Sequence, residues 1–527
     1  MKNRLRLIAL GSYELDEIDN YYTRYHEDVI PHMTYTDFSE FKKNGLRVGY
    51  EEQYFNRRRR LNSTFMMYIA YGSRYLAELC DLIWAVCDEF TWALPAHTDA
   101  NNDAYRCIDL FNAETAMSLT EIAFLLGDVL PDDIKERIRC EVNRRVVEPF
   151  ENGSFAWETM RHNWAAVCGS CIGMIYLYND KPVPERIFSA LNSYLSGFAN
   201  DGVCLEGLGY WSYGFGYFMY FAMLLLEKTG RDITSDDKIL AIARFQQNMY
   251  FGTEAISCSD SSPDTAPLTG LTGLLCEHFK GKVSAPRVMP VRNDECGRWA
   301  HYIRSFIYTP IMSENAKPEA SCPDSQWYIR HTGSYGVFIK GGCNAEPHNH
   351  NDVGSFILAD KFGQVLCDIG CGEYTADYFD ESKRYGYLCN SSFGHSVPII
   401  DGNGQLPGSE RRCTEFNCSD NYVELHFGNA YDSEVDIKRE LYLFRDRLAL
   451  SDSFLFSDGS RHSITERFIS RIRPKLKDGV IQIGSFRTNI PGSISSQTIK
   501  GHGGEDITVY FIDFEVKNSS FKVEFRL

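Results

Sequence analysis

The sequence is poor in the residues that mark unusual protein classes. Glycine (41) and proline (18) are too few for a collagen-like or low-complexity chain of 527 residues. Cysteine occurs 17 times, without repeated spacing, which excludes a disulfide scaffold and favours reduced thiols. The longest apolar run, from Tyr217 to Leu226, is about half of the ~20 residues that a membrane-spanning helix needs. These shortages indicate a globular protein without a membrane partner.

The N-terminus also lacks a secretory signal of ordinary length. It begins with the basic segment MKNRLR, and the apolar run that follows has only four residues. The apolar region of a secretory signal has at least roughly seven. We therefore expect a cytoplasmic protein.

Positive charge is scarce as well. The chain has 54 Lys and Arg against 71 Asp and Glu, a net charge of −17 at pH 7. This acidic balance argues against nucleic acid as the main partner. A small polyanion in a local basic cleft stays open, and the run from Arg57 to Arg60 either helps to hold such a ligand or forms a solvated helix face. The 31 tyrosines fit core packing or ring stacking against a flat ligand such as a sugar.

Apolar residues at helical spacing dominate the first 310 residues. Gly127 would end the second of the predicted helices, Asp132 or Asp133 would cap the third, and Pro149 would stop it. Helices of this length with short loops form antiparallel hairpins, which stack as a solenoid or a closed ring. The predicted helices cover residues 76–87, 108–126, 132–146, 155–178, 183–199, 211–229 and 236–251.

The pattern changes after a polar, proline-bearing stretch at 310–325, which we predict to be a linker. From Trp327 onwards apolar and polar residues alternate, as is typical of half-buried strands. Strands without helices between them favour an antiparallel sandwich. We therefore predict an α+β chain with an all-α domain over 1–315, an antiparallel β-sandwich domain over 326–527, and a ligand cleft between them. The clearest strand runs are 422–427, 441–450, 507–516 and 521–527.

The densest group of chemically active residues is EPHNHNDVGSF, which starts at Glu346. Its histidines, His348 and His350, are two positions apart and would share one face of a strand. One of them could bind a metal ion while the other acts as acid or base. Asp368 and His395 follow, and two imidazoles with one carboxylate suit zinc. The alternative is that these are ordinary polar loop residues.

Other segments could line a cleft. His162 and Asn163 stand in the segment RHNW at the start of a helical stretch. Trp92 and His97 follow a helix and either line a sugar cleft or belong to the core and a helix cap.

The segment EGLGYWSYGFGY starts at Glu206 and is unusually rich in glycine. Glycines this dense before an apolar helix indicate a tight loop, which could expose Tyr210 or Tyr213 to a cavity. A helix–helix turn packed with aromatic residues explains the segment equally well.

Together, and in this order, the motifs resemble the heparinase II/III-like polysaccharide lyases. The resemblance spans residues 75–400 and rests on H-x-H-N-D-x-G-S-F, L-x-D-x-G and the Ser/His turn, with H-N-W and E-G-x-G-Y-W-x-Y-G upstream. It implies an incomplete (α/α) toroid followed by an antiparallel β-sandwich, and β-elimination on uronic-acid polysaccharides. In one departure Ser396 follows His395, where the family commonly has A-H-N, and this leaves open whether Tyr385 or Tyr387 faces the cleft.

The resemblance also implies catalytic roles. The C5 proton of a uronate is weakly acidic, and neutralising the adjacent carboxylate lowers the cost of removing it. Asn163, helped by His162, would do so. His348 would contact the uronate and act as base when the C5 proton lies on the face of the sugar opposite to Tyr213. Tyr213 would be the general acid, and in syn elimination also the base, with Tyr210 as the alternative.

The remaining implied residues hold a metal ion and the substrate. His350, Asp368 and His395 would bind one divalent ion with a structural role, bracing the strand that carries the base. Zinc is the expected ion and manganese the alternative. Tyr374 and Arg384 would contact the substrate, as would Trp92, His97 and Tyr210 if they line the cleft.

We therefore expect a carbon–oxygen lyase whose partner is an anionic glycosaminoglycan oligosaccharide and whose product carries a C4–C5 unsaturated uronate. A cytoplasmic enzyme would meet imported fragments of hyaluronan, chondroitin or heparan rather than intact polymer. Alginate is the rival substrate. The rival classes are a toroid glycoside hydrolase using carboxylates from Glu89, Asp201 and Glu206, and a non-catalytic carbohydrate-binding protein. The sequence leaves homo-oligomer formation open.

Overall fold

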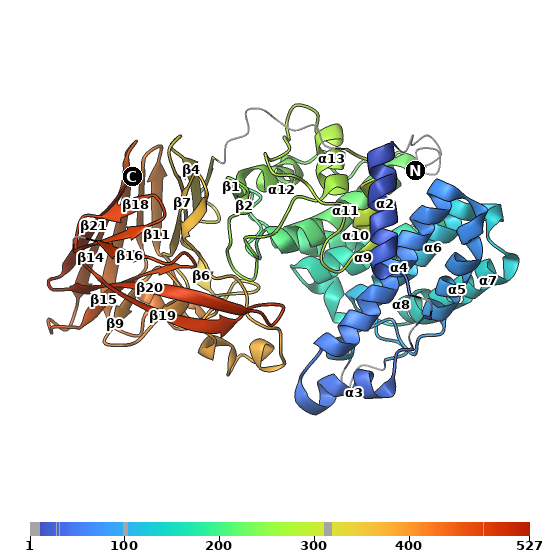
Figure 1. Ribbon diagram of the computed structural model, residues 1–527, viewed down its shortest axis with the longest axis horizontal. Helices are drawn as coiled ribbons and strands as arrows, with labels where there is room; N and C mark the ends of the chain where they lie inside the picture. The colour runs from blue at the N-terminus through green and yellow to red at the C-terminus, as the bar shows by residue number, and fades with distance from the viewer. Residues whose placement is uncertain (1–10, 28, 31, 99–103, 310–318, 478) are drawn as a thin grey trace.

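The computed structural model describes residues 11–27, 29–30, 32–98, 104–309, 319–477 and 479–527. Helices fill the N-terminal part and strands the C-terminal part, so the chain is α+β as predicted (Figure 1). Most of the predicted linker, 310–318, lies outside the described residues, as do the first ten residues, on which the expected location rests. In the described part of the chain, no helix combines the length and apolar character needed to cross a membrane.

Helices of the N-terminal part pack around one apolar core. At its centre α9 contacts α6, α10 and α11, and nearly all of its residues are buried because it has no polar face. Gly127 is the C-cap of α6, as predicted. The α-helices are α2 (Ser12–Tyr25), α3 (Tyr35–Asn44), α4 (Val48–Tyr71), α5 (Leu76–Cys87), α6 (Leu110–Leu126), α7 (Asp132–Val142), α8 (Glu148–Asn152), α9 (Asn163–Tyr178), α10 (Glu185–Leu195), α11 (Leu208–Thr229), α12 (Asp237–Asn248), α13 (Thr269–His278) and α14 (Trp299–Arg304).

The helix predicted at 132–146 differs from the prediction at both ends. Pro131, not Asp132 or Asp133, occupies the N-cap position of α7. At the other end Pro149 does not stop the chain, because a π-helical turn, Asn143–Val147, leads directly into α8. Pro149 is thus the second residue of α8 and lies within a continuous helical segment.

The C-terminal part contains three larger antiparallel sheets. Their strand orders are β11-β12-β13-β14-β21-β18-β17-β16, β3-β4-β5-β7-β8 and β19-β20-β15-β9. The strands are β1 (Tyr250–Phe251), β2 (Glu254–Ala255), β3 (Ala320–Cys322), β4 (Trp327–His331), β5 (Gly336–Lys340), β6 (Cys343–Asn344), β7 (Phe356–Asp360), β8 (Gly363–Leu366), β9 (Pro398–Ile400), β10 (Gly408–Arg412), β11 (Glu415–Ser419), β12 (Tyr422–His426), β13 (Val435–Leu443), β14 (Arg447–Phe456), β15 (Ile464–Ser470), β16 (Lys475–Lys477), β17 (Val480–Ile483), β18 (Phe486–Thr488), β19 (Ser493–Lys500), β20 (Asp506–Val516) and β21 (Ser520–Arg526).

One predicted strand is two. The run at 441–450 spans the end of β13, a tight turn and the start of β14, and Leu443 pairs with Leu448 across the hairpin. The backbone N–H of Phe444 donates to the carbonyl of Arg447 and closes the turn. The apolar alternation continues on both sides of this turn, so the pattern alone does not reveal it.

The five-stranded sheet joins the two parts because both of its faces are buried. Along β4 and β5, Trp327 and Phe338 belong to the core of the helical part, whereas Tyr328 and Val337 belong to the core shared by the sheets. Successive side chains of a strand point to opposite faces, so the same strands serve two cores. Loops at this boundary carry the candidate site.

Candidate active site

His348 and His350 lie in the loop between β6 and β7, and not on a strand as predicted. The loop holds His348 at φ +55°, a left-handed conformation that is costly for a residue with a Cβ and is often found at functional sites. The two imidazoles nevertheless converge on one carboxylate. Nδ1 of His348 lies 2.8 Å from Oδ2 of Asp260, and Nε2 of His350 lies 3.1 Å from its Oδ1.

Asp260 reaches this loop from the segment between β2 and α13, and its side chain is fully buried. Its carboxylate also accepts hydrogen bonds from the Tyr378 hydroxyl (2.5 Å) and the Arg384 guanidinium (3.3 Å). Burial alone would raise the pKa of Asp260, but the hydrogen bonds from His348 and His350 hold it well below its usual value. Sequence reasoning missed this residue, because its segment SCSDSS reads as an ordinary polar loop and its partners stand 88 or more positions away.

Glu206 faces the other nitrogen of His348. Its Oε2 lies 3.6 Å from Nε2 and is buried without a hydrogen-bond partner, while the imidazole side chain stays one-fifth (21%) exposed. Burial raises the pKa of Glu206 to about 7, although the backbone N–H of Asn163 and a positive charge on His348, when that imidazole is protonated, lower it. At neutral pH this carboxyl can therefore donate or accept a proton.

His162 and Asn163 stand where α9 begins, with His162 as the N-cap residue. Nδ1 of His162 lies 3.2 Å from Oδ1 of Asn163, and the Asn163 backbone N–H binds Glu206. Burial lowers the pKa of His162, so the imidazole is neutral at pH 7. The structure thus brings the predicted RHNW and HNH segments together.

Tyr210 lies directly on His348. The two rings are stacked with centroids 3.9 Å apart, and the Tyr210 hydroxyl is 2.9 Å from the Tyr374 hydroxyl. Burial and the charge of Asp260 raise the pKa of Tyr210 well above its usual value, so its hydroxyl keeps its proton at neutral pH. Tyr210 and Tyr374 are thus part of the cluster around His348.

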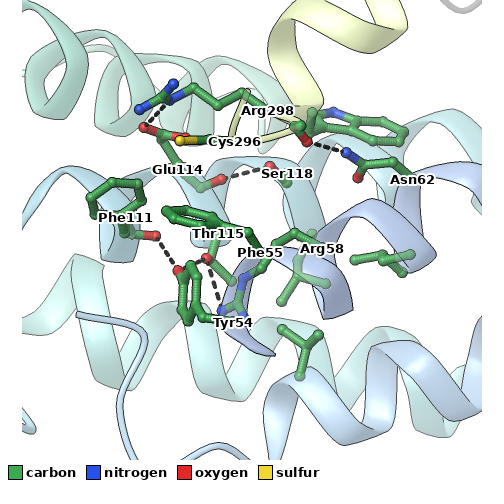
Figure 2. A pocket seen from close by; sticks show the side chains of 15 residues that line it. Tyr54, Phe55, Arg58, Asn62, Phe111, Glu114, Thr115, Ser118, Cys296 and Arg298 are labelled. Carbon is green, nitrogen blue, oxygen red and sulfur yellow. Dashed lines mark hydrogen bonds and ion pairs between the residues drawn. The ribbon is translucent and has the colours of Figure 1, made fainter. Parts of the chain in front are cut away.

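Tyr213 points to a different set of partners. Its hydroxyl donates to Glu114 on α6, and the guanidinium of Arg298 lies 3.8 Å from its ring centroid. Figure 2 shows the ion pair of Glu114 and Arg298, which lines a small pocket with Phe111 and Thr115. Burial and the charge of Glu114 raise the pKa of Tyr213 well above its usual value.

The basic run is not a solvated face. Arg58 makes a two-pronged contact with Glu89 at 2.6 and 2.7 Å, and Arg57 binds the same carboxylate at 3.0 Å. Arg58 also lies 3.4 Å from the ring centroid of Tyr54, next to the pocket of Figure 2. These guanidinium groups therefore pair with a buried carboxylate inside the helical part.

Three residues that were predicted to contact the substrate are engaged with other groups of the protein. Trp92 is fully buried, and its Nε1 donates to a backbone carbonyl, so it is a packing residue and cannot touch a ligand from this position. Arg384 is largely buried and binds Asp260 and the carbonyl of Asn349, which makes it a structural anchor. His97 is partly exposed and lies 2.7 Å from Oδ2 of Asp109.

His350, Asp368 and His395 come together as the resemblance implied. Oδ2 of Asp368 lies 3.7 Å from Nδ1 of His350 and 3.5 Å from Nδ1 of His395, and the candidate ligand atoms lie within 4.8 Å of one another. Both Nδ1 atoms are buried without a hydrogen-bond partner. The opposite Nε2 atoms face Asp260 and the carbonyl of Cys389, which leaves the Nδ1 lone pairs directed at the centre. Two such imidazoles and one carboxylate oxygen fit a zinc ion.

With this geometry in view, the likeness to solved structures is informative. Heparinase III superposes with a TM-score of 0.61 at 10% identity, over 100% of this chain and 91% of its own. The fold is that of heparinase III. A heparan sulfate lyase of Pedobacter heparinus gives 0.61 at 11% identity (98% and 83% covered), and a chondroitin AC lyase of Streptomyces coelicolor A3 gives 0.60 at 11% (100% and 82%).

No family model and no curated protein matches the sequence. At 10–12% identity, the likeness to these lyases establishes the fold alone. The heparinase-like fold that the motifs implied is therefore confirmed, and the chemistry has to be argued from the residues of the site.

Proposed function

We propose that the protein is a polysaccharide lyase that cleaves uronic-acid-containing glycosaminoglycan oligosaccharides by β-elimination. The observation that carries this proposal is the arrangement around His348, with a carboxylate on one imidazole nitrogen and a half-protonated carboxyl beyond the other. The solved structures that share the fold include heparan sulfate and chondroitin lyases. By the same analogy we propose that the helical part is an incomplete (α/α) toroid and that the sheets form a β-sandwich.

The first requirement of the reaction is a neutralised uronate carboxylate, and two hydrogen-bonding groups of the site support it. When protonated, Glu206 can donate a hydrogen bond to that carboxylate, and the side-chain amide of Asn163 can add a second. A pKa of about 7 makes protonated Glu206 abundant at neutral pH. Sequence reasoning considered Glu206 only as a hydrolase carboxylate.

The bond changes then need one base and one acid. Nε2 of His348 takes the C5 proton, the C–H electrons form the C4–C5 double bond, and the C4–O4 bond breaks. A tyrosine hydroxyl donates its proton to the departing O4. The base must be neutral, and in neutral His348 the proton that Asp260 holds on Nδ1 leaves the lone pair on Nε2.

We assign the acid to Tyr210 rather than to Tyr213. The acid and the base must reach neighbouring atoms of one sugar, and the Tyr210 ring is stacked on His348. The Tyr213 hydroxyl is instead bound to Glu114 beneath Arg298. We place Tyr374, which contacts the Tyr210 hydroxyl, at the rim of the substrate site.

We propose that His350, Asp368 and His395 hold one divalent ion, zinc before manganese. When bound, the ion would supply structural cross-linking of three loops, among them the one that carries His348. The buried, unpaired Nδ1 atoms support this assignment. The cytoplasmic location and the question of a homo-oligomer stay predictions.

The carboxylates of the rival hydrolase are engaged elsewhere. Glu89 is bound by Arg57 and Arg58, and Asp201 accepts two hydrogen bonds from Ser325. A glycosidase needs two carboxyl groups on either side of the scissile bond, and Glu206 has no such partner among the three candidates.

The deciding experiment offers separate hyaluronan, chondroitin, heparan and alginate oligosaccharides to the purified protein. The ultraviolet absorbance of the conjugated C4–C5 double bond should rise with one glycosaminoglycan class. A rise with alginate alone would make the protein an oligoalginate lyase. New reducing ends without a rise in absorbance would mean hydrolysis. The absence of both signals would contradict the proposal.

A further inference from the structure

We infer that Asp260 is the positioning residue of this site, and that its single carboxylate fixes the tautomers of both His348 and His350. This inference rests on the proposed function only for its kinetic readout. Asp260 lies outside every motif of the sequence. It belongs to the helical half of the chain and contacts the β6–β7 loop of the sheet half.

The hydrogen-bond geometry defines what Asp260 does. An ionised carboxylate only accepts hydrogen bonds, so Nδ1 of His348, 2.8 Å from Oδ2, must carry a proton. In the neutral imidazole, Nε2, which faces Glu206 and the exposed side of the site, is then the nitrogen with the lone pair. Without the Asp260 carboxylate, the remaining acidic partner of His348 would be Glu206, 3.6 Å from Nε2, and nothing would hold the proton on Nδ1.

The same carboxylate sets the orientation of His350. Its Nε2, 3.1 Å from Oδ1 of Asp260, must carry a proton there, so Nδ1 is the nitrogen that can offer a lone pair to an ion between Asp368 and His395. The Tyr378 hydroxyl and the Arg384 guanidinium complete the four donors and leave the carboxylate little freedom to rotate. Asp260 therefore joins the base and the candidate metal centre through one rigid group.

A strained backbone adds to the need for such an anchor. His348 sits at φ +55°, a conformation that costs free energy and persists when the surrounding contacts hold it. The fully buried carboxylate supplies that hold from a different part of the chain.

Asp260→Asn tests the inference with a matched control. The asparagine amide keeps the shape of the side chain. Its NH2 group replaces one carboxylate oxygen and cannot accept the hydrogen bonds that this oxygen accepted. Glu121→Gln is the control, because Glu121 is also a fully buried carboxylate that binds a tyrosine, an arginine and a third donor, Trp299, away from the site. We expect kcat of Asp260→Asn to fall about 10²- to 10⁴-fold while KM stays within about threefold, and Glu121→Gln to keep both.

Nitrogen-15 NMR of histidine-labelled full-length protein tests the tautomers directly, with His348→Gln and His350→Gln assigning the signals. In the wild type we expect the proton of His348 on Nδ1 and that of His350 on Nε2, and in Asp260→Asn a mixture for His348. Metal content should fall as well, because loss of such a supporting group weakens metal binding about 10- to 100-fold.

Each outcome decides. A folded Asp260→Asn with wild-type kcat, or a wild-type His348 protonated on Nε2 alone, would overturn the inference. If the variant does not fold, the wild-type spectrum decides without it. If the wild type shows no lyase activity, the proposed function fails while the spectrum still tests the role of Asp260.

Discussion

The imidazole of His348 lies flat on the phenol ring of Tyr210, with ring centroids 3.9 Å apart and 23° between the planes. The two residues come from opposite halves of the chain, one from the loop before β7 and the other from the first turn of α11. The contact therefore places a base and a phenolic acid side by side at the boundary between helices and sheets. It also provides the sharpest way to test which tyrosine acts.

Replacing the two tyrosines separately should give opposite results. Tyr210→Phe keeps the stacked ring but removes the proton donor, so kcat should fall about 10²- to 10⁴-fold. Tyr213→Phe removes the donor to buried Glu114, which should cost about 1–3 kcal/mol of unfolding free energy and leave kcat within about threefold. Double-bond absorbance and urea unfolding measure both effects, and an inactive Tyr213→Phe beside an active Tyr210→Phe would reverse the assignment.

Glu206 should make the protein less stable as the pH rises. Its folded-state pKa is raised from 4.5 to about 7, so between these values the folded chain holds a proton that the unfolded chain has released. This group should therefore lower the free energy of unfolding by about 3 kcal/mol between pH 4.5 and 7, with no further change above.

Glu206→Gln isolates that contribution because the amide does not titrate. The difference in unfolding free energy, wild type minus variant, should be constant below pH 4.5, fall through pH 7 and then level off. Urea titrations at pH values from about 4 to 8 measure it. A difference that does not change with pH would show that Glu206 titrates normally in the folded protein.

Removal of a proposed metal ligand should affect both metal content and stability. His395→Gln should retain less than the one ion per chain expected for the wild type, because one of three ligands is lost. A chelator should lower the Tm of the wild type and change that of the variant little. His426→Gln, at a hydrogen-bonded histidine on β12, serves as control and should behave like the wild type. Equal metal content in all three proteins would refute the site.

Arg439 should prove one of the most sensitive positions for stability. Its guanidinium is fully buried, pairs with Asp452 and Glu466, and donates to the carbonyls of Gly354 and Ser396 at 2.8 Å. These carbonyls belong to the loops that carry two of the proposed metal ligands. Arg439→Leu leaves two buried carboxyl groups without their cation, so we expect a loss of roughly 3–5 kcal/mol in urea unfolding. A loss below about 1 kcal/mol would contradict this view.

The fold class of the chain and many of its helices and strands could be predicted from local sequence signals. Apolar spacing placed α5 and α6, glycine marked the end of α6, and alternation marked the last two strands, because these signals are local. Motif order also pointed to His350, Asp368 and His395, which the structure brings within ligand distance of one another. The local pattern gave a wrong prediction where it fits two structures. It predicted a helix end at Pro149 and a single strand where β13 and β14 form a hairpin.

The assembly of the site could not be predicted in this way, because it depends on contacts between segments that are distant in the sequence. Asp260 has no motif around it, and only the approach of the helical half to the β6–β7 loop makes it the partner of two histidines. Tyr210 and Tyr213 stand in the same glycine-rich segment, yet one lies on His348 and the other on Glu114. The sequence specifies the chemical type of each side chain. Its burial, its pKa and its hydrogen-bond partners depend on contacts between residues that are far apart along the chain.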